Sequence, residues 1–386
     1  MEGRNLHLSA VILAAGFSSR MGRLKALLPL NGHTALEQGI ALFRQNHVRQ
    51  IIVVTGHRSG QIADALQGEP VVAAHNPDYR QDMFSSVRTG VKCLDLHSRG
   101  IFILPVDIPL VRPATVGRLI QAFEDNPKSI IHPSFYGKRG HPPLIPADLA
   151  TAVLAWPGTG GLRGFLAQHE SAAVQVEVPD AFILEDMDSP EDYRRLRRAR
   201  QHWEIPNRAE CDLMLSEVFR VQKGIADHSR RVAEVAESLG RALLDTGEQL
   251  DLHLLSAAAL LHDVAKGRLG HAEVGGAWLN DLGFGRVGTV VAAHHDLLTP
   301  AADTLDECAI LYLADKLVWG DKRVPLEDRF KVAMERFGHQ ARVRAKILQR
   351  LDKAKAIVRV LERKTGKKLT ALLPYKESPA PERGAA

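Results

Sequence analysis

The sequence predicts an α/β domain with a Rossmann-like, mostly parallel sheet, followed by an all-α domain. The chain has 386 residues, which exceeds the ~100 to 200 residues of a usual domain. Residues 8–192 alternate short β-rich runs with helical stretches, the pattern of parallel strands joined by crossover helices. From about residue 211 onward such runs end, and apolar residues recur at helical spacing.

Each predicted element follows from a short stretch of sequence. The expected strands are LSAVILAA, QIIVVTG, GIFILPVD, SIIHPSF and AAVQVEV, and the clearest later helices are HSRRVAEVAESLGRALL and DLHLLSAAALLHDVAK. A proline in QHWEIPN marks the join between the two halves. We therefore expect domains at 1–200 and 211–375, a linker at 201–210 and a disordered tail at 376–386.

Composition narrows the class of protein. The hydrophobic fraction of 45%, the charged fraction of 25% and the net charge of +5 are those of an ordinary globular protein. No apolar run approaches the ~18 residues that cross a membrane, and the N-terminus lacks a signal-peptide layout. We expect a cytoplasmic protein without a membrane partner. The arginine run at 194–200 lacks interleaved aromatic residues, so we interpret it as a solvated helix face and expect no nucleic acid partner.

The segment LAAGFSSRMGRLK follows the first predicted strand and precedes a helix. Small residues let backbone N–H groups approach a triphosphate, and Arg20 and Lys25 add positive charge. A plain strand-to-helix turn would not require Ser, Arg and Lys at these offsets. The expected nucleotide-binding residues here are Leu13, Ala14, Ala15, Gly16, Ser18, Gly22 and Lys25.

The LAAGxSxRMGxxK string resembles the MobA-like nucleotidyltransferases, and especially molybdenum cofactor cytidylyltransferases of the MocA type. Further blocks follow in family order, namely LLPL, VTGH, NPD, SSVRTG, PVDIP and GHP. The resemblance covers about residues 8–198 and implies transfer of a nucleotidyl group from an NTP to a phosphorylated acceptor. There are two departures: PVDIP replaces the family's GDQP, and GTGGLR at 158–163 lacks the acid of its GDxGAR.

Acidic residues supply the expected metal site. Asp107 ends the run GIFILPVD, where α/β folds present ligands at strand carboxyl ends. Magnesium held by carboxylates would offset the phosphate charges during transfer, with Arg20 and Lys25 stabilising the transferring phosphates. The resemblance gives Asp188 as the second metal ligand, although an aspartate before Ser189 could instead cap a helix.

The resemblance also suggests the substrates. It implies that Ser85 and Arg88 line the nucleotide or acceptor pocket and that His141 contacts a pterin, although His141 could equally be a turn histidine. LAAG rather than LAGG, and Lys25 without a preceding Asp, resemble cytidylyl enzymes, so CTP is expected, with GTP and ATP as alternatives. The expected acceptor is a molybdopterin-type cofactor. The missing acid in GTGGLR leaves open a sugar phosphate or another phosphorylated alcohol.

A second motif lies in the helical half and reads H…HD…D, in which three separate predicted helices carry His228, His262 with Asp263, and Asp315. Such groups can converge on one divalent metal, whose bound water becomes a nucleophile near neutral pH. Unrelated surface histidines would not fall in this order. The pattern resembles HD-domain phosphohydrolases over roughly 211–340.

Additional histidines indicate a second metal in this half. In dinuclear HD subgroups, such as those similar to YqeK-type diadenosine tetraphosphate hydrolases, histidines in these contexts hold it, here His271 and one of His294 or His295. No GYP follows, which disfavours a cyclic-di-GMP enzyme. We expect Fe²⁺ or Mn²⁺ at this site. Asp263 is expected to act in catalysis, and Lys266 to contact a substrate phosphate.

Together these features predict a nucleotidyltransferase that uses CTP and a molybdopterin-type acceptor, fused to a metal-dependent HD phosphohydrolase. An alternative is a cofactor carrier or insertion chaperone, in which the HD half senses a nucleotide or docks an apo-molybdoenzyme. Multiple rounds of pyrophosphate release would separate the two hypotheses.

Overall fold

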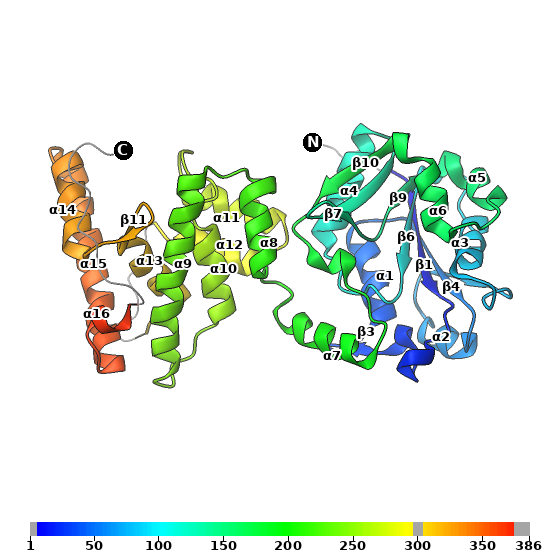
Figure 1. Cartoon of the computed structure of the whole chain (residues 1–386), viewed down its shortest axis with the longest axis horizontal. Coiled ribbons are helices and arrows are strands. Elements are labelled where there is room, and N and C mark those ends of the chain that lie inside the picture. Colours follow the sequence, from blue (N-terminus) through cyan, green and yellow to red (C-terminus); the bar gives the residue numbers. More distant parts are fainter. Residues whose placement is uncertain (1–5, 296–303, 374–386) are drawn as a thin grey trace. The chain divides into compact units, whose positions relative to one another are not determined.

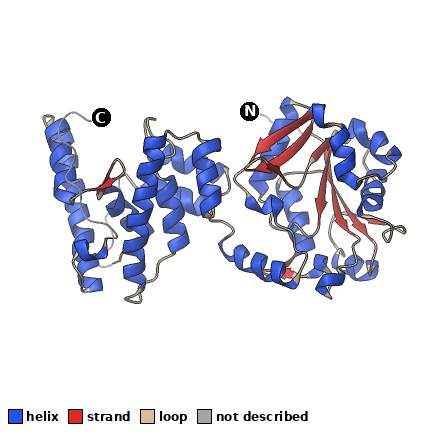
Figure 2. Cartoon of the chain, viewed as in Figure 1, coloured by secondary structure: helices blue, strands red, loops and turns tan. Residues whose placement is uncertain are grey.

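A computed structural model of the chain describes residues 6–295 and 304–373 (Figures 1 and 2). The chain divides into two compact units, Met1–Trp203 and Glu204–Ala386, which are described separately below. The predicted linker at 201–210 spans this division. The predicted disordered tail at 376–386 lies outside the described residues.

The N-terminal unit is built on one sheet with strand order β10-β7-β9-β6-β1-β4-β5, in which β8 also pairs with β7. The pairs β1 with β4, β1 with β6, β4 with β5 and β7 with β10 are parallel, and only β9 and β8 run antiparallel to their neighbours. All five predicted runs form strands, and the mostly parallel sheet is confirmed. The strands are β1 (Leu8–Ala14), β4 (Gln50–Thr55), β5 (Val72–His75), β6 (Gly100–Pro105), β7 (Ile130–Phe135), β8 (Lys138–Arg139), β9 (Leu144–Pro146) and β10 (Ala173–Glu177).

Helices cover both faces of this sheet (Figure 2). Alternate residues of β1 point to opposite faces, so Val11 packs with α3 while Ile12 lies against α1. Because both faces are covered, every residue of β1 and β6 is buried. The helices are α1 (Ala35–Gln45), α2 (Ser59–Ala65), α3 (Met83–Lys92), α4 (Pro113–Asp125), α5 (Ala150–Ala155), α6 (Gly161–Gln168) and α7 (Pro190–Ala199), with a short hairpin of β2 (Pro29–Leu30) and β3 (His33–Thr34).

The sheet brings two loops together at the carboxyl ends of its central strands. Leu13 on β1 pairs with Pro105 on β6 in parallel register, so both strands reach their carboxyl ends together. The Val106 N–H donates to the Leu13 carbonyl at 3.1 Å and extends this contact beyond the strands. The segment after Ala14 and the segment after Pro105 therefore lie side by side, where open α/β sheets bind ligands.

The C-terminal unit is a helical bundle around a core that includes the fully buried Tyr312 and Phe284. One small hairpin of β11 (Val318–Trp319) and β12 (Lys322–Arg323) departs from the predicted all-helical domain, because strands of two residues leave no periodic signal. None of the described helices is long and apolar enough to span a bilayer. The helices are α8 (Arg208–Leu213), α9 (Lys223–Leu244), α10 (Leu252–Leu261), α11 (His271–Asp281), α12 (Gly285–Ala293), α13 (Glu307–Lys316), α14 (Leu326–Phe337), α15 (Ala341–Thr365) and α16 (Leu369–Leu372).

Candidate active sites

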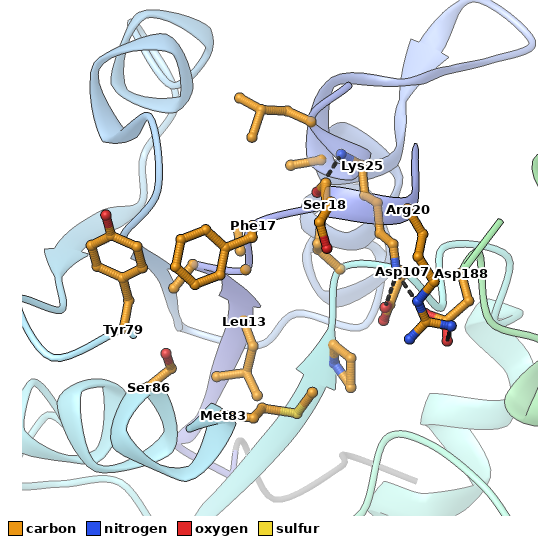
Figure 3. A pocket seen from close by; sticks show the side chains of 18 of the residues that line it. Leu13, Phe17, Ser18, Arg20, Lys25, Tyr79, Met83, Ser86, Asp107 and Asp188 are labelled. Carbon is orange, nitrogen blue, oxygen red and sulfur yellow. Dashed lines mark hydrogen bonds and ion pairs between the residues drawn. The ribbon is translucent and has the colours of Figure 1, made fainter. Parts of the chain in front are cut away.

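The loop after β1 folds back on itself and brings Lys25 toward the sheet edge (Figure 3). Ser18 and Gly22 both adopt left-handed backbone angles, with φ of 53° and 65°, and bracket the single turn Ser19–Met21. The Ser18 Oγ accepts a hydrogen bond of 3.1 Å from the Lys25 N–H, which closes the loop. A left-handed residue such as Gly22 costs little without a Cβ, whereas Ser18 carries some strain.

Lys25 joins two carboxylates from distant parts of the chain. Its Nζ donates to Asp107 Oδ2 at 2.9 Å and to Asp188 Oδ1 at 2.6 Å, and Arg20 pairs with Asp188 Oδ2 at 3.1 Å. Asp107 follows β6, and Asp188 precedes α7. The alternative role for Asp188 is wrong, because Ser189 caps α7 by accepting from the Asp192 N–H.

The charges in this cluster are strongly coupled. Burial alone would lower the pKa of Lys25, but the hydrogen bond to Asp188 and the charge of Asp107 raise it above its ordinary value. The same hydrogen bond lowers the pKa of Asp188, whereas burial and the neighbouring carboxylates raise the pKa of Asp186. The two carboxylates thus converge on one cation. Two hard oxygen donors that already share a positive charge fit a magnesium-type ion.

A pocket of about 410 Å³ opens beside this cluster. Figure 3 shows the Phe17 and Tyr79 rings at one side, with centroids 5.3 Å apart, and the charged residues at the other side. An aromatic end suits a nucleobase and a charged end suits its phosphates. The predicted residues that line this pocket are Leu13, Ala14, Ala15, Gly16, Ser18, Arg20, Lys25, Asp107 and Asp188.

Three predicted nucleotide-binding residues, Gly22, Ser85 and Arg88, do not line the described pocket. Gly22 shapes the loop. Ser85 is buried, where its Oγ donates to the Asp82 carbonyl at 2.7 Å and accepts from Asn76, and its neighbour Ser86 lines the pocket instead. The Arg88 guanidinium donates to the Trp156 carbonyl and lies 5.1 Å from the Phe84 ring centroid.

A second cavity of about 1100 Å³ adjoins the first and contains His141. The two cavities share walls formed by Leu13, Asp82, Met83 and Pro105. Burial lowers the pKa of His141. Sequence reasoning missed His132, which lines the same cavity; its signal was a histidine inside the apolar run SIIHPSF. It also missed Phe17 and Tyr79, because aromatic residues in loops resemble core residues in sequence.

In the C-terminal unit, every predicted metal ligand converges on one place. Within each of three groups, the ligand atoms lie within 4.8 Å of one another. The residues come from α9, from α13, from the start of α11 and from the segments directly after α10 and α12. The members of the groups are His228, His262 and Asp315; His262, Asp263 and His294; and His271, His294 and His295. The H…HD…D pattern therefore describes a real cluster of nitrogen and oxygen donors.

Backbone carbonyls orient three of the imidazoles. The Nδ1 atoms of His228, His262 and His294 lie 2.8, 2.8 and 2.6 Å from the carbonyls of Gly320, Ala259 and Val291. A carbonyl can only accept, so each Nδ1 carries a proton and each Nε2 is turned toward the cluster, where a neutral ring would offer its lone pair to a metal. Gly320 belongs to the turn between β11 and β12, so the hairpin that the sequence did not predict sets the orientation of His228.

Asp263 lies between two halves of the cluster. Its Oδ2 is 3.9 Å from His228 Nε2 and 3.5 Å from His262 Nε2. Its Oδ1 is 3.4 Å from His271 Nε2 and 3.9 Å from His294 Nε2. Each oxygen of this carboxylate therefore faces its own pair of imidazoles. This arrangement fits two metal ions that share Asp263 as a ligand.

Several ligand atoms lack ordinary partners. His262 Nε2, Asp263 Oδ1 and His271 Nε2 are buried without a hydrogen bond within the described chain. Burial alone would lower the pKa of His262, but the negative charges of Asp263 and Asp315 raise it. Buried polar atoms are normally satisfied, so this excess of unpaired donor atoms fits divalent metals. Lys266, predicted to contact a phosphate, donates to Asp263 Oδ2 at 2.8 Å.

Comparison with known proteins follows the same division of the chain. The MobA-like NTP transferase domain family matches residues 10–173, and the HD domain family matches residues 225–320. The molybdenum cofactor cytidylyltransferase of Escherichia coli is 29% identical over 187 residues, which are 48% of this chain and 93% of that protein. The nicotine blue oxidoreductase of Paenarthrobacter nicotinovorans is 29% identical over 202 residues, which are 49% and 95% of the two chains.

Solved structures resemble the N-terminal half. A nucleotidyl transferase from Methanothermobacter has 27% identity and a TM-score of 0.45, covering 51% of this chain and 98% of its own. A molybdopterin-guanine dinucleotide biosynthesis protein A from Archaeoglobus fulgidus has 14% identity and a TM-score of 0.41, covering 50% and 99%.

Proposed function

Because residues 10–173 belong to the MobA-like NTP transferase domain family and residues 225–320 to the HD domain family, we propose a bifunctional enzyme. The N-terminal unit transfers CMP from CTP to a molybdopterin-type cofactor and releases pyrophosphate. The C-terminal unit hydrolyses a phosphate ester or anhydride. The observation that carries the first activity is the bridge from Lys25 to Asp107 and Asp188 at the charged end of the pocket.

The transfer step follows from the residues at that end. An acceptor phosphate oxygen forms a bond to the α-phosphorus of CTP while the bond to the pyrophosphate oxygen breaks. Lys25 and the exposed Arg20 place positive charge where negative charge accumulates. Asp107 and Asp188 would hold Mg²⁺, which supplies further charge neutralisation when bound.

The choice of CTP has two supports. The loop reads LAAG, as in cytidylyl enzymes, and the Escherichia coli relative is named a cytidylyltransferase. The aromatic end of the pocket offers a stacking surface for a base. Stacking alone does not select among bases, so the nucleotide must be tested directly.

The test is pyrophosphate release by the purified chain with Mg²⁺ and each of CTP, GTP and ATP, without an acceptor, with molybdenum cofactor or with a sugar phosphate. We expect release over many turnovers only with CTP and the cofactor. Release with a sugar phosphate instead would change the acceptor, in line with the missing acid of GTGGLR. Stoichiometric retention of the cofactor without repeated pyrophosphate release would support the carrier alternative.

For the C-terminal unit we propose Fe²⁺ or Mn²⁺, because imidazole nitrogen predominates among the donors. Metal at this site would supply a hydrolytic nucleophile near neutral pH. Asp263 positions the two ligand groups, and the half-exposed Lys266, which donates to Asp263 in this structure, would turn to a bound substrate phosphate. Hydrolysis of bis(p-nitrophenyl) phosphate should require Mn²⁺ or Fe²⁺ and stop in His262→Ala. Equal hydrolysis by that variant would contradict the assignment.

A further inference from the structure

The larger cavity of the N-terminal unit is lined by two histidines on adjacent segments, one buried and one partly buried. His132 lies on β7 and is 4% exposed, and His141 lies just before β9. The Gly140 N–H donates to the Pro133 carbonyl at 2.9 Å, so the segment that carries His141 is fixed beside β7. The His141 N–H donates to the Ile183 carbonyl, also at 2.9 Å, which anchors it from the other side. The backbone that carries His141 is therefore fixed beside the strand that carries His132.

Each imidazole has a ring nitrogen without a partner. His132 Nε2 and His141 Nδ1 are both buried and make no hydrogen bond to any described residue. Burial lowers the pKa of both, and with the charge of Arg139 it brings the pKa of His132 to about 4. Both rings are therefore neutral at pH 7, each with one donor and one acceptor nitrogen. Buried polar atoms of this kind are usually satisfied, so a bound molecule is expected to complete them.

We infer that His132 joins His141, for which the family resemblance already implies a pterin contact, in binding the hydrogen-bonding edge of the acceptor's planar heterocycle, a ring of the pterin class. This inference rests on the proposed function and assigns His132 a role in choosing the acceptor. The edge of a pterin carries both hydrogen-bond donors and hydrogen-bond acceptors. It can therefore pair with neutral imidazoles, each of which offers one donor and one acceptor nitrogen. A phosphate or carboxylate would instead need cationic partners.

The apolar part of the cavity lining supports a flat group. It consists of Phe84, Val87, Ile103 and Leu166, which offer a surface for a planar ring, while polar side chains such as Arg163 and Glu170 line the cavity as well. Two arginines line the cavity, of which Arg163 is exposed and Arg139 is already engaged, since two of its nitrogens lie 2.6 Å from the two carboxylate oxygens of Glu170.

The same placement orients the acceptor. The walls shared by the two cavities include Leu13 and Pro105, which lie at the strand ends beside Asp107. A heterocycle bound at His132 would leave a phosphorylated side chain directed toward Lys25 and Asp107. The acceptor phosphate would thus meet the nucleotide at the charged end of the first pocket.

The test is a titration of the full chain with 6-hydroxymethylpterin, followed by pterin fluorescence. We expect saturable binding that is weakened at least 10-fold in His132→Phe, which keeps an aromatic ring but removes both nitrogens. His132→Gln keeps a donor and an acceptor and should recover part of the affinity. His97→Gln, at an exposed histidine that lines neither described cavity, should bind like wild type.

CTP binding and thermal unfolding of each variant show whether it is folded. Equal pterin affinity in His132→Phe and wild type, or no pterin binding by wild type, would overturn the inference. Failure of the transfer assay while His132→Phe still loses pterin binding would count against the proposed function alone. Transfer with an unchanged KM for the acceptor in His132→Phe would count against the inference alone.

Discussion

Lys25 carries a positive charge shared by two carboxylates, and its side chain is only 14% exposed. Removing one member of such a set leaves the others without their counter-charge, which costs more than the net value of the pair. The same residues belong to the pocket in which phosphates are expected. Substitutions here therefore test chemistry and must be checked for folding separately.

Asp107→Asn should reduce nucleotidyl transfer at least 100-fold, because the neutral amide carries no negative charge and binds a divalent metal poorly. Hydrolysis by the C-terminal unit should be unchanged. Pyrophosphate release and bis(p-nitrophenyl) phosphate hydrolysis are measured on the same preparation. Asp64→Asn, at an exposed position of α2, is the matched control and should keep both activities. Loss of both activities in Asp107→Asn would refute independent sites.

His132 predicts a pH dependence of stability. Its folded pKa of about 4 lies below the ordinary value of 6.5, so the unfolded chain binds the extra proton first as pH falls. The N-terminal unit should lose about 2 kcal/mol between pH 6.5 and pH 4 through this group, allowing for some solvent screening. Urea unfolding across this range should show a smaller loss for His132→Asn. An identical pH profile for that variant would contradict the buried neutral state.

At the scale of elements, the nucleotide pocket depends on how closely three segments meet. The His57 N–H after β4 donates to the Ala15 carbonyl at 3.1 Å, which ties the loop after β1 to the end of β4. A Cβ on Gly56 would lie 2.6 Å from Tyr79 Cβ and 2.9 Å from Ala15 Cβ. No side chain fits there without moving the aromatic end of the pocket.

Gly56→Ala should therefore displace Tyr79 and raise the KM for the nucleotide several-fold, with a loss of about 1 to 3 kcal/mol in stability from overpacking. Steady-state kinetics and thermal unfolding measure the two effects. Gly60→Ala is the control, because nothing lies within 4 Å of its added Cβ and it falls within α2. That variant should be neutral or slightly stabilised. Equal kinetics in both variants would show that Tyr79 does not shape nucleotide binding.

The sequence predicted the strands and helices that are long enough to show a hydrophobic pattern. It missed strands that are too short to show one. Apolar runs such as GIFILPVD correctly predicted buried strands. The sequence did not predict β9, which is three residues long and follows two prolines, or β5, which is the edge strand of the sheet and is mostly exposed. The ligand motifs were predicted because their order carries the signal. The partners of Ser85 and Arg88 and the cavity wall at His132 depend on tertiary packing, which no local pattern encodes.

At the scale of the whole molecule, the two units hold chemically different sites. The N-terminal site offers carboxylate oxygens, and the C-terminal site offers mostly imidazole nitrogens with Asp263 and Asp315. Oxygen donors favour Mg²⁺, whereas imidazoles favour transition metals. The two activities should therefore respond to different metals.

Mn²⁺ should stabilise the C-terminal unit, whereas Mg²⁺, which prefers oxygen donors, should stabilise it much less. At 100 times its Kd, one bound ion adds about 2.7 kcal/mol, which corresponds to roughly 5 to 10 °C in Tm for a unit of this size. Calorimetry with Mn²⁺, Mg²⁺ or EDTA should show a shift of the C-terminal transition with Mn²⁺ that Mg²⁺ does not reproduce. His262→Ala should remove the shift, whereas His339→Ala, at an exposed histidine outside the metal groups of the described residues, should keep it. A shift retained in His262→Ala would place the ion elsewhere.

The shared walls of the two cavities have a consequence for the end of the reaction. A dinucleotide product would touch both cavities at once, through Leu13, Asp82, Met83 and Pro105. A molecule held at two adjoining subsites dissociates more slowly than either half, because release of one half leaves it tethered by the other. Departure of the finished cofactor, rather than its synthesis, would then limit throughput. A downstream protein that takes the product directly would remove this limit.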